Sequence, residues 1–77
     1  MLIQYDKDAD AIYIKIKQGK YAYGKDLDDL RRVDYDVKDH PIGIELLCVS
    51  HGIDTADLPQ RHEIEELLSA QCFKVLV

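Results

Sequence analysis

The chain has 77 residues, of which 47% are hydrophobic and 32% are charged, and its formal net charge is −5 at pH 7. This length allows one domain, residues 1–77, and the composition excludes a disordered chain, although so short a core gains stability from oligomerisation or from a partner. The acidity disfavours nucleic acid and anionic membranes as partners and favours proteins or cationic molecules.

The first two strands are predicted from alternating side chains near the start of the chain. Leu2 to Tyr5 is expected to form a short strand and Asp6 to Asp10 an acidic turn, because aspartate is depleted in strands and common in turns. Isoleucine then returns at every second position, as in a strand with one buried face. The inward residues are Ile12, Ile14 and Ile16, and they alternate with Tyr13, Lys15 and Lys17.

Three further strands are expected before residue 50. The first lies within Lys20–Asp28, and the second runs from Leu30 to Val37. The second strand is expected to turn Val33, Tyr35 and Val37 inward, and the third to bury Ile42, Ile44, Leu46 and Cys48.

A weak internal repeat links these strands at an offset of 30 residues. The pair Tyr5-Asp6 recurs as Tyr35-Asp36, and the isoleucine series that begins at Ile12 recurs from Ile42. The repeat indicates two similar hairpins, which arose either by duplication or by convergence on the same step from strand to turn.

The period of the hydrophobic pattern changes after a connector at Gly52–Asp57. A helix is predicted from about Pro59 to Ala70, with Asp57 as its N-cap. Its apolar face carries Ile64, Leu67 and Leu68. Cys72 to Val77 then alternates in the manner of a terminal strand.

These elements predict an α+β fold. Residues 1–50 are expected to form a hairpin core, and residues 58–77 to add a helix and a last strand. The architecture is therefore a small antiparallel sheet of five or six strands built from hairpins, with one C-terminal helix packed on a face.

The location of the protein is predicted from its cysteines and its apolar segments. Cys48 and Cys72 are far apart in the sequence, no secretory leader precedes Tyr5, and no apolar run reaches the roughly 18–20 residues that span a bilayer. We therefore expect a cytoplasmic protein without a membrane partner, in which both cysteines are buried reduced thiols.

Two motifs carry a resemblance to a known family. YDKDADAIYI begins at Tyr5, and DYD at Asp34 is followed by GIELL at Gly43. Over about the first fifty residues the chain resembles domain-of-unknown-function family 2283, a group of short prokaryotic proteins. One departure is His40-Pro41, where the resemblance leads us to expect Gly or Asn in the turn.

The resemblance implies a small antiparallel sheet and no established activity. The helix and last strand look like an extension that some members carry. Genes of this family often lie beside small toxin-like genes, so the resemblance implies, by association, an antitoxin-like role or another partner-binding role.

The acidic turn is a candidate cation site. Asp6, Asp8 and Asp10 begin like a calcium loop, but the positions that need Gly and a bidentate Glu hold Ala11 and Lys17. A solvated turn is favoured, with weak cation binding as the alternative.

A zinc site is also disfavoured. His40, His51 and His62 with Cys48 offer one close ligand pair, whereas structural zinc sites in short chains usually use two. No metal site and no cofactor are therefore predicted.

No catalytic residue is predicted either, because no nucleophile lies beside a base in an assembled set. Glu45 is the one carboxylate in the middle of a strand, between Ile44 and Leu46. It is interpreted as a surface carboxylate paired with Lys or Arg across the sheet. The alternative is a small enzyme or ligand-binding protein with a sheet-face pocket around Glu45.

A group of aromatic and basic side chains is the candidate interaction face. Its residues are Tyr13, Tyr21, Tyr23, Arg31 and Arg32. Such side chains stack on single-stranded nucleic acid, which the acidity disfavours, and they also anchor protein interfaces. Packing of the tyrosines within the domain is the third interpretation. The leading hypothesis is a non-catalytic protein-interaction module that forms a homodimer or binds a small protein partner.

Overall fold

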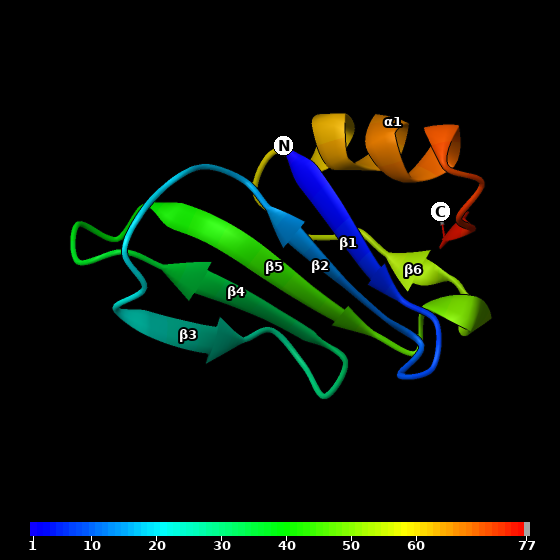
Figure 1. Cartoon of the computed structure of the whole chain (residues 1–77), viewed down its shortest axis with the longest axis horizontal. Helices are drawn as coiled ribbons and strands as arrows, with labels where there is room; N and C mark the ends of the chain where they lie inside the picture. The colour runs from blue at the N-terminus through cyan, green and yellow to red at the C-terminus, as the bar shows by residue number, and fades with distance from the viewer. Residues whose placement is uncertain (77) are drawn as a thin grey trace.

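The predicted α+β fold is confirmed by the structure, a computed structural model that describes residues 1–76 (Figure 1). Within these residues, five antiparallel strands form one sheet in the order β1-β2-β5-β4-β3. The strands are β1 (Leu2–Asp6), β2 (Ala11–Lys15), β3 (Tyr23–Asp26), β4 (Arg31–Tyr35) and β5 (Pro41–Leu47). They are followed by a 3₁₀ turn η1 (Val49–His51), β6 (Ile53–Asp54), α1 (Arg61–Ala70) and β7 (Val75–Leu76).

The two repeated hairpins lie side by side in the sheet. The β1–β2 hairpin meets the β4–β5 hairpin through β2 and β5, and Ile14 is paired directly with Ile44. These residues are also the ones related by the 30-residue offset. Because β2 and β5 are antiparallel, half a turn about the Ile14–Ile44 pair exchanges one hairpin with the other. The repeat in the sequence is therefore a local two-fold symmetry of the sheet.

The core lies between one face of the sheet and α1. Isoleucines at alternate positions of β2 and β5 face the helix, and Ile64 and Leu68 of α1 pack against them. The buried cluster consists of Ile12, Ile14, Ile16, Val33, Ile44, Leu46, Val49, Ile53, Leu58, Ile64 and Leu68. In Figure 1, α1 lies on the side of β1, and β3 forms the opposite edge of the sheet.

The helix begins two residues later than predicted, and Asp57 is not its N-cap. Gln60 occupies the N-cap position with a left-handed backbone, and Asp57 is itself left-handed at φ 64°. The physical reason is that Leu58 is buried in the core, so the chain turns at Asp57 to bury it before the helix can start. The buried Thr55 hydroxyl then donates to the Glu65 carboxylate at 2.5 Å, which holds the pKa of Glu65 below its usual value.

Two residues predicted to face inward, Val37 and Cys48, lie outside the core. The Asp36 carboxylate accepts the backbone N–H groups of Lys38 and His40, so β4 gives way to a turn, and Val37 is 83% exposed in it. Cys48 leaves the strand alternation because its backbone is left-handed, at φ 53°, where the chain enters η1.

The prediction of buried cysteines was therefore wrong for both cysteines. Cys48 and Cys72 are free and exposed, and Cys72 also has a left-handed backbone, at φ 65°, just after α1. Each cysteine lies where the chain changes direction, outside the regular elements.

The last strand does not join the main sheet. Its regular part is Val75–Leu76, which pairs in parallel with Ile53–Asp54, a segment predicted to be a connector without a strand. The predicted end of this strand, Val77, lies outside the described residues. A small second sheet thus closes the core beside α1. No helix within residues 1–76 combines the length and the apolar character needed to cross a membrane.

Candidate functional site

The face of the sheet opposite α1 carries the candidate site, and we call it the outer face. Antiparallel register places directly paired residues on the same face, so one row can be followed across all five strands. The row that runs from β1 to β3 is Gln4, Tyr13, Glu45, Arg32 and Asp26. The outer face therefore holds Tyr13, Glu45 and Arg32 side by side, with no described element lying over them (Figure 1).

Tyr13 lies flat over the sheet in a space that Gly43 leaves open. A Cβ atom built on Gly43 would lie 1.8 Å from the Tyr13 hydroxyl oxygen, so only glycine fits beneath the ring. The hydroxyl donates to the Asp34 carboxylate at 3.0 Å. Burial, and then the hydrogen bond and charge of Asp34 with a smaller effect of Glu45, raise the pKa of Tyr13 to about 12.

The missed members of this cluster are Asp34 and Gly43. A glycine at an outward position of a strand that is otherwise rich in branched residues was the available signal, because it often marks a close approach by another group. The sequence alone does not show which side chain makes that approach, since Tyr13 and Gly43 are neither paired directly nor close in the chain.

We predict that Asp34→Asn lowers the pKa of Tyr13 from about 12 while leaving it above 10, because the charge is lost and the burial remains. Ionisation of Tyr13 can be followed by NMR or by tyrosinate absorbance, with Tyr13→Phe to identify its transition. The raised pKa also means that Tyr13 stabilises the fold fully below pH 10 and that this contribution is lost as the pH rises through about 12. An unchanged pKa in Asp34→Asn would contradict the assignment.

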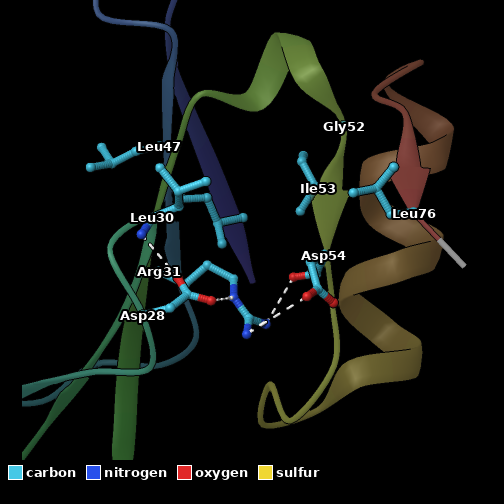
Figure 2. Close-up of a pocket in the computed structure, with 9 residues that line it drawn as sticks. Asp28, Leu30, Arg31, Leu47, Gly52, Ile53, Asp54 and Leu76 are labelled. Carbon is cyan, nitrogen blue, oxygen red and sulfur yellow. Dashed lines mark hydrogen bonds and ion pairs between the residues drawn. The ribbon is translucent and has the colours of Figure 1, made fainter.

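Arg31 does not lie on the outer face, although its neighbour Arg32 does. Arg31 is paired with the core residue Leu46 and points to the helix side, because successive strand residues face opposite ways. Its guanidinium donates to the Asp28 carboxylate at 2.9 Å and to the Asp54 carbonyl oxygen at 3.0 Å (Figure 2). It also donates to the Ala56 carbonyl oxygen at 2.6 Å. Arg31 thus joins β4 to the segment that leads to α1, a structural role that the sequence did not suggest.

A small cavity lies beside Arg31, between the two sheets. Its volume is about 130 Å³, and its walls include Leu30, Leu47, Ile53 and Leu76 (Figure 2). Pockets for small-molecule ligands usually measure about 300–1,000 Å³. The cavity is therefore too small for a typical metabolite site, and we interpret it as a packing gap where the two sheets meet.

The two remaining tyrosines of the predicted interaction face lie elsewhere. Tyr23 is paired with Tyr35 on the helix side of the sheet, where the two rings stack with centroids 5.1 Å apart. Its hydroxyl donates to Asp39 at 2.6 Å, and this hydrogen bond is the main reason that the pKa of Tyr23 is raised to about 12. Tyr21 is exposed in the loop before β3. Of the five predicted residues, the sheet brings together Tyr13 and Arg32.

Glu45 lies between two open hollows of the outer face. One hollow, of about 330 Å³, extends towards β3 and is lined by Arg32. The other, of about 420 Å³, extends towards β1 and is lined by Tyr13. Glu45 and Leu47 line both hollows. The predicted ion pair of Glu45 is absent among residues 1–76, because Arg32, its neighbour across the sheet, pairs instead with Asp26 at 3.0 Å.

The acidic turn has a structural role in this arrangement. Asp6 accepts the backbone N–H of Ala9, and the Asp10 carboxylate accepts the Ser50 hydroxyl and backbone N–H at 2.6 and 3.0 Å. Asp10 therefore ties the first hairpin to the turn after β5. Across residues 1–76, no three His, Cys, Asp or Glu side chains converge as metal ligands would. Weak cation binding by Asp6, Asp8 and Asp10 stays the alternative to a solvated turn.

Comparison with known protein families gives a match. The model of a family described as "Protein of unknown function (DUF2283)" matches residues 2–50. This segment includes both hairpins and β3, and it therefore contains Tyr13, Asp34, Gly43 and Glu45. No curated protein matches the chain, and no solved structure does.

Proposed function

The chain belongs to this family of proteins of unknown function, and we propose that it is a non-catalytic protein-interaction module that binds its partner through the outer face. The observation that carries the proposal is the openness of this face across all five strands, opposite the face that α1 covers. A sheet with one face left uncovered offers a broad, rigid platform, which suits another protein better than a small molecule.

Apolar and polar groups on the outer face are mixed as in a protein interface. Leu2, Leu30 and Leu47 are exposed there at 56%, 45% and 38%, and Tyr13 and Arg32 are of the types that anchor interfaces. The two hollows beside Glu45 give the face relief into which side chains of a partner can fit. Such a face supports binding by shape and apolar contact.

The charge of the outer face favours a basic partner surface. Within the five strands, four carboxylates point to this face against two cations, and the whole chain carries a net charge of −5. The carboxylates are Asp6, Asp26, Asp34 and Glu45, and the cations are Lys15 and Arg32. Electrostatic complementarity speeds association and selects among partners. The chain resembles a family whose genes often lie beside small toxin-like genes. The product of an adjacent gene is therefore the first partner to test, in an antitoxin-like complex.

The test is co-expression with the adjacent gene product, followed by measurement of the native mass and of Kd. We expect a complex with the wild-type chain and at least about tenfold weaker binding for Leu47→Lys, which places a cation between the two hollows. Val37→Lys is the matched control, because it makes the same charge change at an 83% exposed turn residue. The absence of a complex, or equal binding by Leu47→Lys, would contradict the proposal.

A second candidate function rests on the position of Glu45 between the two hollows. A ligand-binding or catalytic site there would use the Glu45 carboxylate with Tyr13 close by. Glu45→Gln in the same experiment separates the candidates, since it removes the charge with little change of shape. If stability, partner binding and cell phenotype are all unchanged in Glu45→Gln, the second candidate is rejected.

A further inference from the structure

One edge of the five-stranded sheet is open to pairing. Among the described strands β1 is bonded to β2 alone, and four of its five residues are exposed. An edge strand presents a row of unpaired N–H and C=O groups, which is a template for another strand. We propose that β1 pairs antiparallel with β1 of a second copy of this chain, so that the two sheets join edge to edge in a symmetric dimer.

The first argument is that β1 lacks the features that prevent edge pairing. Proteins protect edge strands with Lys, Pro, bulges or very short strands. β1, LIQYD, contains no Lys or Pro and pairs with β2 without a bulge, and its one charge is the terminal Asp6. The opposite edge, β3, is shorter and carries Lys25, Asp26 and a glycine. The two edges of one sheet thus differ in protection, and β1 is the unprotected one.

The second argument is that β1 is complementary to itself. An antiparallel pair centred on Gln4 sets Ile3 opposite Tyr5 of the other copy, and Gln4 opposite Gln4. Aromatic and β-branched residues paired across strands stabilise a sheet, and the two Gln4 amides can donate to and accept from one another. Asp6 faces Leu2 of the other copy, so no like charges meet within the five pairs.

The third argument is the apolar surface that this edge exposes. Met1, Leu2 and Tyr5 are 44%, 56% and 47% exposed. The Tyr5 and Phe73 rings pack edge-on, with their centroids 5.0 Å apart. Tyr5 therefore lies at the border of the core with half of its surface in solvent, where Ile3 of a second copy would cover it. On the outer face, Leu2 of the second copy would lie beside Asp6, at the rim of the hollow lined by Gln4 and Ala11.

The dimer extends the outer face without using its centre. The edge lies at one side of the row that runs from Gln4 to Asp26, so Glu45 and Leu47 stay open in both copies. The proposal is therefore independent of the proposed function, and each can fail alone.

The experiment is the native mass of the purified chain over a concentration series, compared with 8.9 kDa for the monomer. We expect the wild type to reach twice this mass, and Gln4→Lys to raise the Kd for dimerisation by roughly tenfold or more, because two like charges face each other at the centre. Val37→Lys adds the same charge at the exposed turn and should dimerise as the wild type does. Leu47→Lys should also dimerise, which separates this test from that of the outer face.

The decisive arm uses opposite charges at the same position. Gln4→Glu and Gln4→Lys should each be monomeric alone, because each strand repels its copy. An equimolar mixture should restore the dimer, because lysine then faces glutamate at the two-fold axis. Circular dichroism of each variant establishes that it is folded. A wild type that stays monomeric, a Gln4→Lys chain that dimerises normally, or a mixture that stays monomeric would overturn the proposal.

Discussion

Gly43→Ala is expected to destabilise the protein by about 2–4 kcal/mol, measured as the change in free energy of unfolding in urea. The added Cβ would lie 1.8 Å from the Tyr13 hydroxyl oxygen, and the ring cannot stay in place. Overpacking of this kind costs about 1–3 kcal/mol, and loss of the hydrogen bond to Asp34 adds about 1 kcal/mol. A domain of this size has about 3–5 kcal/mol of net stability, so a measurable fraction of the molecules should be unfolded.

The control for Gly43→Ala is alanine at Gly24, another glycine of the sheet. A Cβ on Gly24 would meet the Arg32 Nε at 2.9 Å and the Asp34 Oδ1 at 3.0 Å, and both atoms belong to the outer parts of side chains that can shift, unlike the Tyr13 ring over Gly43. Gly24→Ala should therefore cost less than about 1 kcal/mol. In addition, Tyr13→Ala removes the clash, so Tyr13→Ala/Gly43→Ala should be no less stable than Tyr13→Ala alone. Additive costs in this double variant would show that Tyr13 and Gly43 do not interact.

The hairpins were predictable because their information is local. The alternation of Ile12, Ile14 and Ile16, and of Ile42, Ile44 and Leu46, fixes which side of each strand is buried. The aspartates between them favour turns, and the 30-residue repeat indicates that the same hairpin is used twice. Physical constraints between near neighbours in the chain can be read from the sequence alone.

The errors occurred where one backbone angle or one distant contact decides the structure. Cys48 continues the alternation of β5 in the sequence, but a left-handed backbone turns it out of the sheet. Ile53–Asp54 is too short to show a period, and it forms a strand because Val75–Leu76 lies beside it. Alternation alone should have separated Arg31 from Arg32, since neighbouring residues of a strand face opposite ways.

The candidate site was predicted in part for the same reason. Tyr13, Glu45 and Arg32 are all outward residues of confirmed strands, so their shared face follows from period and strand order together. The order β1-β2-β5-β4-β3 could not be derived from local pattern, and it is what places Glu45 between Tyr13 and Arg32. The Tyr13–Asp34 hydrogen bond spans β2 and β4 over the glycine of β5, and no local rule predicts such a contact.

Leu68→Ala is expected to destabilise the protein by about 2–5 kcal/mol, because it opens a cavity under a fully buried side chain. This cost is comparable with the whole net stability of about 3–5 kcal/mol. Leu68 lies outside residues 2–50, the segment that the family match covers. The prediction therefore tests whether the C-terminal extension is an integral part of the core. The loss of stability is measured by thermal unfolding of Leu68→Ala and of the wild type, followed by circular dichroism.

Leu67→Ala is the matched control, since it removes the same atoms from the adjacent residue of α1, which is only half-buried. We expect Leu67→Ala to retain cooperative unfolding with a clearly smaller loss of stability than Leu68→Ala. Equal effects of the two variants would mean that α1 contributes helix propensity but no specific packing. The inner face of the sheet, with Ile14 and Ile44 at its centre, would then be stable without its cover. The packing of Ile64 and Leu68 on those isoleucines argues for the opposite result, in which the sheet of residues 2–50 needs α1 to fold.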